Sequence, residues 1–311
     1  MAWITHRQFD DFIVQRWQNS LSLVPKLRKL AGDLIIWNKD IFGNLFRRKQ
    51  TIRARLEGIQ RRLAESGQRH LLKLEAQLRK EYNDILNQLE LLWFQKSRME
   101  ALRDGDRNTR YFHLSTTVRR RYNRVEGLQN QAGDWITEPD HVRRLVADFF
   151  ASLYSEPVPE FDTDDILQDQ FPRISHESLT QLERPFTFTE VQTALFSMGS
   201  FKAPGPDGFL AFFYQRFWSL VRDSVFQMVL SMLGGQSLPK GLNETYITLI
   251  PKVPHPQLAS QFRPISLCNV CYTLITKVIV QRLKNILPEL IAPTQTSFVP
   301  GRQIGDNIVI M

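Results

Sequence analysis

Two basic residues near the ends of adjacent predicted strands have the chemistry to bind a triphosphate. Lys252 follows the β-branched segment 246–250, which Pro251 ends, and Arg263 opens the next segment. If the two segments pair as a hairpin, an ammonium and a guanidinium point toward one place, where they bind phosphate as a point charge and a planar fork. Both residue types also occur at strand ends as ordinary surface charges.

A second candidate surface is the segment 96–124, which has nine basic and three acidic residues. Guanidinium groups beside interleaved aromatic rings suit phosphate contacts combined with base stacking. Because three consecutive arginines cannot all be paired or buried cheaply, this favours nucleic-acid binding over a basic helix whose aromatics are core. The predicted contacts are Lys96, Arg98, Arg103, Arg107, Arg110, Arg119, Arg120, Arg121, Tyr122 and Arg124.

The loop 202–208 also suits a phosphate contact. Its two prolines stiffen it, and Gly205 and Gly208 let a backbone approach closely, so that its amides and Lys202 can hold a nucleic-acid phosphate. The alternative is a rigid turn in which Asp207 caps the following helix.

Residues for metal chemistry are not predicted in these 311 residues. Two-metal nucleotidyl transfer needs carboxylates held at a fixed separation, and the closest candidate, 161–165, has no flanking apolar strand and is read as a solvated connector. Cys268 and Cys271 form C-x-x-C, but a tetrahedral zinc site needs two more ligands. We expect the cysteines to be small buried residues at a helix start, and no cofactor bound by this chain alone.

Four blocks stand in a fixed order: 201–208 (FKAPGPDG), 246–252 (YITLIPK), 261–267 (QFRPISL) and 295–302 (QTSFVPGR). Their order and spacing resemble the reverse transcriptase of LINE-type non-LTR retrotransposons, particularly plant ones. The resemblance implies that Lys252 and Arg263 contact the triphosphate of the incoming nucleotide. It places the loop 202–208, Gln295 and Arg302 beside the template, although Arg302 can also be a surface charge. RNA or an RNA/DNA hybrid is the implied partner.

The N-terminal half resembles, less specifically, the linker between endonuclease and polymerase in such polyproteins, through 37–43 and 96–113. The family's metal-binding carboxylates, on a palm strand and in a Tyr-x-Asp-Asp hairpin, do not occur in the 311 residues. The resemblance therefore implies a fragment of an RNA-directed DNA polymerase, a nucleotidyltransferase, that ends before the palm. We expect it to be inactive alone, with Mg²⁺ needed only by the complete polymerase. The alternatives are a non-enzymatic helical interaction or RNA-binding module, and a decayed sequence that does not fold stably.

The elements that must position these residues begin with a helical hairpin. Apolar residues at alternating three- and four-residue spacings over 52–92 predict two helices with a coiled-coil-like stripe, interrupted at 65–68. We read the charged outer face as solvated surface, and a partner helix at the hairpin is the rival interpretation.

Turn and capping signals predict the remaining elements. The sequence predicts a short β-hairpin over 125–135 and two capping boxes, Thr137 with Asp140 and Thr187 with Glu190. The second box starts a helix that Gly199 ends. Further helices are expected around 212–218, 225–232 and 271–287, the last closed by Pro288.

These elements predict a mainly α fold with small β elements (α+β). The expected domains are a helical basic linker domain (1–155) containing the hairpin, an acidic Pro-containing connector (156–186), and an incomplete fingers subdomain of a right-hand polymerase (187–311). A net charge of +8 and a pI near 9.6 favour a polyanionic partner. Without a signal sequence or an apolar run of about 20 residues, we expect a soluble intracellular protein, in the nucleus or cytoplasm, with no membrane partner.

Overall fold

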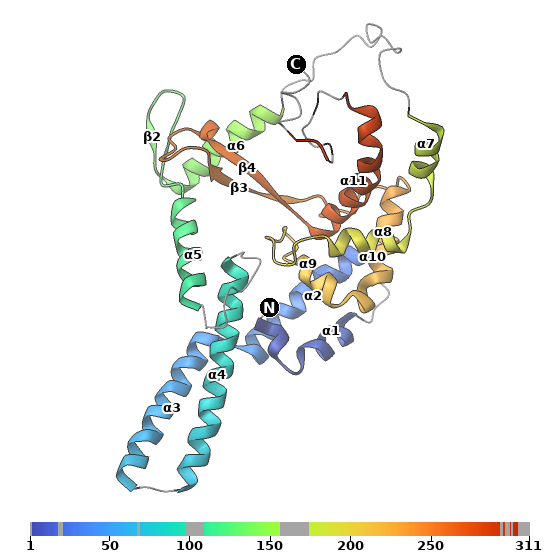
Figure 1. Ribbon diagram of the computed structural model, residues 1–311. Helices are drawn as coiled ribbons and strands as arrows, with labels where there is room; N and C mark the ends of the chain where they lie inside the picture. The colour runs from blue at the N-terminus through green and yellow to red at the C-terminus, as the bar shows by residue number, and fades with distance from the viewer. Residues whose placement is uncertain are drawn as a thin grey trace. The chain divides into compact units, whose positions relative to one another are not determined.

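The computed structural model describes residues 2–17, 21–66, 69–97, 109–155, 174–292, 295, 299 and 301–303. Helices dominate, and the strands form two small antiparallel pairs, which confirms the mainly α fold with small β elements (Figure 1). The chain forms two compact units. Unit 1 combines 1–124 with 199–221, and unit 2 combines 125–198 with 222–311. The linear division at 155 and 187 stays a prediction, and the predicted acidic connector lies largely outside the described residues.

The predicted helical hairpin is present in unit 1. Helices α3 (Leu45–Ser66) and α4 (Arg69–Ser97) lie side by side, as Figure 1 shows. Their facing apolar stripes are buried, because leucine and isoleucine at heptad-like spacing put one side of each helix against the other. Leu74 was expected on this seam but is largely exposed. The buried seam residues are Ile52, Ile59, Leu71, Leu78, Ile85 and Leu89.

The rest of unit 1 gathers aromatic side chains around the N-terminal helices. These elements are η1 (Ala2–Thr5), α1 (Phe9–Trp17), α2 (Leu23–Trp37), a π-helical turn η2 (Asn38–Phe42) and α9 (Ala211–Arg216). Ring centroids of Phe9 and Phe217, and of Trp17 and Phe213, lie 6.2 Å apart, so the segment after the 202–208 loop packs on α1. The helix expected through 218 ends at Arg216 instead, and Trp218 begins α10 (Trp218–Leu233).

Helix α5 (Thr109–Tyr122) packs against α4 within unit 1. Phe112 is buried and meets Phe94 edge to face, with ring centroids 5.4 Å apart. Thr116, one turn later, is also buried and donates its hydroxyl to the Phe112 carbonyl. The basic helix therefore has one face against the hairpin and the other in solvent.

In unit 2 a small core joins two hairpins and a helix. Strands β1 (Leu128–Gln129) and β2 (Trp135–Ile136) form the predicted short hairpin, whose turn includes Gly133 at φ 89°. Helix α6 (Pro139–Tyr154) follows. The predicted capping box of Thr137 and Asp140 is wrong: the N-cap is Glu138, without a side-chain hydrogen bond. Proline at the first helical position explains the shift, because its φ is already helical and it has no N–H to satisfy.

Strands β3 (Thr245–Pro251) and β4 (Phe262–Cys268) form the longer ribbon of unit 2. The helices α7 (His176–Glu183), α8 (Phe188–Phe196) and α11 (Val270–Leu290) belong to the same unit, and α11 contacts both α7 and α8. The capping box of Thr187 and Glu190 is confirmed. Two predicted stops are wrong: α8 ends at Phe196, before Gly199, and α11 continues through Pro288 to Leu290. Pro288 has no N–H to donate to the carbonyl of Lys284, so the helix continues through it with one backbone hydrogen bond fewer. In the part of the chain that the structure describes, no helix is long and apolar enough to cross a membrane.

Candidate nucleic-acid and triphosphate sites

The register of the β3–β4 ribbon places Lys252 and Arg263 on the same face. Arg263 pairs across the strands with Ile250, and the ladder continues past the last paired residues, since the Lys252 N–H donates to the Gln261 carbonyl at 2.9 Å. Side chains two residues apart on a strand share a face, so Lys252 points to the side of Ile250 and is the diagonal neighbour of Arg263. Diagonal neighbours on one face lie about 7–8 Å apart.

The opposite face of the ribbon is the one that is packed. Phe262 is buried in a core with Leu128 and Val142, and Leu249 packs against the same core. These two ribbon residues alternate with Lys252 and Arg263 along the strands, so the basic residues face away from the core. The open face also carries Tyr246 and Ile265, which are 59% and 44% exposed.

The two basic side chains differ in what holds them. The Lys252 ammonium donates to the Ser260 carbonyl at 2.9 Å, which directs it across the connection between the strands. The exposed Arg263 guanidinium has no hydrogen bond or ion pair among the described residues. The ribbon therefore offers one positioned ammonium and one free guanidinium to an anion.

On α5 the three consecutive arginines have different surroundings. Arg119 donates from its two terminal nitrogens to the carbonyls of Ser97 and Lys96, both at 2.7 Å. These are the last carbonyls of α4, which lack a partner inside their own helix. Arg119 thus caps α4, a role that its sequence context did not predict.

The other basic residues of α5, and Arg124 just after it, are exposed to solvent. Arg110, Arg120, Arg121 and Arg124 are exposed and form no side-chain hydrogen bond or ion pair within the described ranges. Tyr122 is 60% exposed. Lys96 instead places its ammonium over the Trp93 ring, 5.0 Å from the centroid. The predicted contacts Arg98, Arg103 and Arg107 lie outside the described residues.

The 202–208 loop is a tight turn, and Asp207 does not cap the helix that follows. The N-cap of α9 is Leu210, without a side-chain hydrogen bond, whereas Asp207 Oδ1 accepts from the Phe209 N–H at 3.0 Å. Burial raises the pKa of the Asp207 carboxyl to about 6, and this hydrogen bond opposes the rise. Gly208 has φ 77°, a conformation that favours glycine.

Within this loop Gly205 is buried, and its phosphate contact stays a prediction. Lys202 is exposed, and its ammonium has no partner among the described residues. Its carbon chain lies against Gly199, where an added Cβ would meet Lys202 Cε at 3.0 Å. Lys202 and the exposed Gly208 remain candidates for a phosphate contact.

The two terminal nitrogens of the Arg302 guanidinium are hydrogen-bonded to carbonyls at and after the end of α11. Its guanidinium donates to the carbonyls of Ala292 and Gln295 at 2.6 and 2.8 Å, and to those of Ile291 and Pro288 at 3.1 and 3.4 Å. The Gln295 side chain is exposed. Arg302 therefore stabilises the chain after α11, and this role competes with the predicted template contact.

Arg282 was not singled out from the sequence, although it is the most engaged arginine of unit 2. It is buried and donates to both carboxylate oxygens of Glu190 at 2.8 and 3.0 Å. It also donates to the carbonyls of Leu182, Arg184 and Pro185, and its guanidinium carbon lies 3.6 Å from the centroid of the Phe186 ring. The one sequence signal for this buried role was a lone arginine within the apolar stripe of a predicted helix.

Neither cysteine is in a disulfide among the described residues. Cys271 is buried at the start of α11, as expected, whereas Cys268 is half-buried at the end of β4 and not at a helix start. Among the described residues, no three His, Cys, Asp or Glu side chains gather where a metal ion could be held.

Comparison with known proteins connects the chain to a mobile element. No profile of a known protein family matches it. Over 218 residues the chain is 31% identical to an uncharacterized 149 kDa protein of transposon TX1 from Xenopus laevis. The match covers 70% of this chain and 17% of that protein, less than a fifth of its length. The chain is related in sequence to a transposon-encoded protein.

Proposed function

We propose that this chain is a portion of the RNA-directed DNA polymerase of a plant-type LINE retrotransposon, and that it binds RNA and the triphosphate of a nucleotide. The relationship to a transposon protein and the four ordered sequence blocks support the assignment to a retrotransposon. The ribbon supports the role: its register gives two basic residues a shared open face, and this is the observation on which the proposal rests.

The ribbon geometry suits a triphosphate. A chain of three phosphates presents several anionic oxygens over a few ångströms, and an ammonium with a guanidinium one diagonal step away can contact two of its phosphates. The packed opposite face, with Phe262 in the core, holds the strands while the open face meets the ligand.

The exposed face of α5 is the proposed RNA contact. Arg121 and Arg120 supply charge without an internal partner, and Tyr122 beside them supplies a ring for stacking. RNA or an RNA/DNA hybrid is the polyanion that the polymerase assignment requires.

A non-enzymatic helical interaction module is the second candidate, and one observation favours it. Tyr111, Leu114, Val118 and Tyr122 follow one another at three- and four-residue spacing along α5, and each is at least half exposed. Such a stripe is typical of a helix that packs against a partner.

Chemical protection of Lys252 tests the triphosphate assignment. The full chain is acetylated with a limiting amine-reactive ester, with and without a deoxynucleoside triphosphate, and modification at each lysine is measured by mass spectrometry. Exposed Lys240 in the same unit is the control. We expect protection of Lys252 and none of Lys240, and Arg263→Gln should reduce the protection. Equal rates at Lys252 with and without the nucleotide would remove the triphosphate from the proposal.

A further inference from the structure

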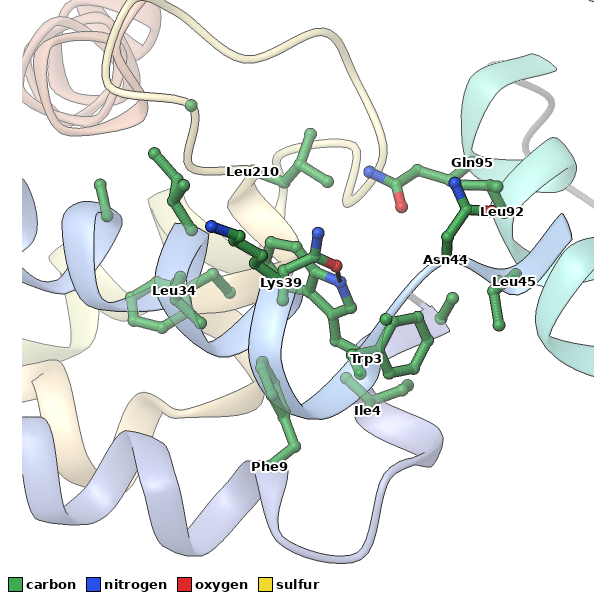
Figure 2. Close-up of a pocket in the computed structure, with 18 of the residues that line it drawn as sticks. Trp3, Ile4, Phe9, Leu34, Lys39, Asn44, Leu45, Leu92, Gln95 and Leu210 are labelled. Atoms are coloured by element: carbon green, nitrogen blue, oxygen red, sulfur yellow. Dashed lines mark hydrogen bonds between the residues drawn. The ribbon is translucent and has the colours of Figure 1, made fainter. Parts of the chain in front are cut away.

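Unit 1 contains an open cavity of about 990 Å³ that the candidate sites above do not include (Figure 2). Its walls come from η1, α2, η2, the start of α3, the end of α4, and the segment 207–217. Apolar side chains predominate, and eight of the 25 lining residues are aromatic, including Trp3, Phe42, Phe46 and Phe212. Phe46 is 49% exposed, so its ring is available to a ligand. The cavity lies at the upper end of the size range of ligand pockets.

Several polar groups of the cavity wall are hydrogen-bond donors, and the lining also includes the Asp207 carboxyl, which is an acceptor. Asn38 Oδ1 accepts from Trp3 Nε1 at 2.8 Å, and Asn44 Oδ1 accepts from the N–H groups of Phe46 and Arg47 at 2.9 and 3.2 Å. With their oxygens used, these amides present their NH₂ groups, which have no partner among the described residues. The ligand that fits must carry acceptors.

Two lining basic residues have free charged groups. Lys39 and Arg47 are exposed, and neither side chain forms an ion pair or hydrogen bond within the described part of the chain. Lys39 stands on the π-helical turn η2, and such turns in helices are frequent at functional sites. Lys39 and the amide of Asn44 lie around the same opening in Figure 2. The ligand must therefore be anionic as well as rich in acceptors.

We propose that this cavity takes unstacked bases of single-stranded RNA. Phe46 and Trp3 supply rings for stacking, Asn38 and Asn44 donate to acceptors on base edges, and Lys39 and Arg47 pair with the adjoining phosphates. A fatty acid fits less well, because it has one anionic head and no acceptors along its chain to meet the two amides. The inference rests on the RNA binding proposed above and adds a site to it.

Fluorescence anisotropy with a labelled single-stranded uridine oligonucleotide tests the charges. Lys39→Gln with Arg47→Gln should weaken binding of the full chain about tenfold and flatten the log–log salt dependence by roughly 1.4, at about 0.7 per phosphate contact. Arg55→Gln with Lys73→Gln removes the same charge from exposed hairpin positions outside the cavity and should change neither. Equal effects of the two pairs would overturn the inference.

Stacking is tested by Phe46→Ala, which should weaken RNA binding about tenfold. Leu72→Ala removes an exposed apolar side chain from α4 outside the cavity and should have no effect. Photocrosslinking with 5-iodouridine should give adducts at Trp3 or Phe46. Adducts confined to 110–124 would overturn the inference and leave the proposed function standing. Absence of RNA binding by the parent chain would overturn both, and a fluorescent fatty acid whose binding depends on Lys39 while RNA binding does not would reassign the cavity.

Discussion

The arginines in and after α11 and the arginines at the end of α5 are used in opposite ways. Around α11, Arg282 and Arg302 donate to seven main-chain carbonyls and one carboxylate between them. On α5, Arg120 and Arg121 point into solvent without a partner among the described residues, and only Arg119 is bonded in the manner of the α11 arginines.

The difference shows what decides the role of an arginine. Helix ends leave up to four carbonyls without partners, and a guanidinium with five N–H groups can satisfy several of them at once. An arginine that reaches such an end becomes part of the fold, whereas its neighbour one residue away stays exposed to solvent. Counting basic residues therefore overstates a nucleic-acid surface.

The largest expected effect is at Arg282. Arg282→Met removes the buried guanidinium from the Glu190 carboxylate, which keeps its hydrogen bonds from Thr187, and leaves three carbonyls without that donor. This should lower the free energy of unfolding by about 3–5 kcal/mol. Urea unfolding of the full chain measures the loss. Exposed Arg222, whose nearest carboxylate oxygen is 3.7 Å away, is the matched control, and Arg222→Met should change little. A loss below about 1 kcal/mol at Arg282 would break the comparison.

The pH dependence of stability should test the same pair, Arg282 and Glu190. The hydrogen bond from Arg282 lowers the pKa of Glu190 from 4.5 to about 2. A carboxyl with a lowered folded-state pKa contributes stability that is present above pH 4.5 and is lost as the pH falls toward 2. Unfolding measured across this range should show a smaller pH dependence in Arg282→Met than in the parent. The same slope in both would mean that another pair governs acid sensitivity.

Arg119 should show the intermediate effect. Arg119→Gln removes two charge-assisted hydrogen bonds to the end of α4 and should cost about 1.5–3 kcal/mol. Arg120→Gln, one residue away, should stay within about 0.5 kcal/mol of the parent. Thermal and urea unfolding of the two variants compare them directly, and equal losses would contradict the division between bonded and exposed arginines.

A carboxyl offers the converse test, because burial raises the Asp207 pKa from 3.8 to about 6. The stability linked to its protonation is fully present below pH 3.8 and is lost as the pH rises through 6. Asp207→Asn keeps an acceptor for the Phe209 N–H and removes the charge, so it should stabilise the chain by on the order of 2 kcal/mol at pH 8 and hardly at pH 4. Destabilisation at pH 8 would show that the charge itself has a partner worth more than its burial costs.

Local patterns were enough to predict several elements. The leucine and isoleucine spacing of 52–92 predicted the buried seam, and Thr187 with Glu190 predicted the helix start. The β-branched segment 246–250 and the segment that Arg263 opens predicted the ribbon. Each depends on residues close in the chain or on one periodicity.

The rest depends on contacts between distant segments. Whether Arg119 binds RNA or a helix end depends on where α4 stops, 22 residues earlier in the chain. The cavity around Phe46 is assembled from separate stretches of unit 1, and no spacing in the sequence brings Trp3 to Asn38. Pro288 was predicted to close α11, because proline removes one backbone hydrogen bond, but the helix continues past it to Leu290.

RNA binding by the exposed arginines of α5 is the most direct test of the account. Anisotropy titrations of single-stranded RNA at several salt concentrations compare the parent with Arg120→Gln plus Arg121→Gln, and with Tyr122→Ala. The double variant should flatten the log–log salt dependence by roughly 1.4, and Tyr122→Ala should weaken binding by about 1–3 kcal/mol with a nearly unchanged slope. If the double variant binds with the parent's affinity and slope, α5 is ordinary solvated surface, and the helical interaction module becomes the better description of this chain.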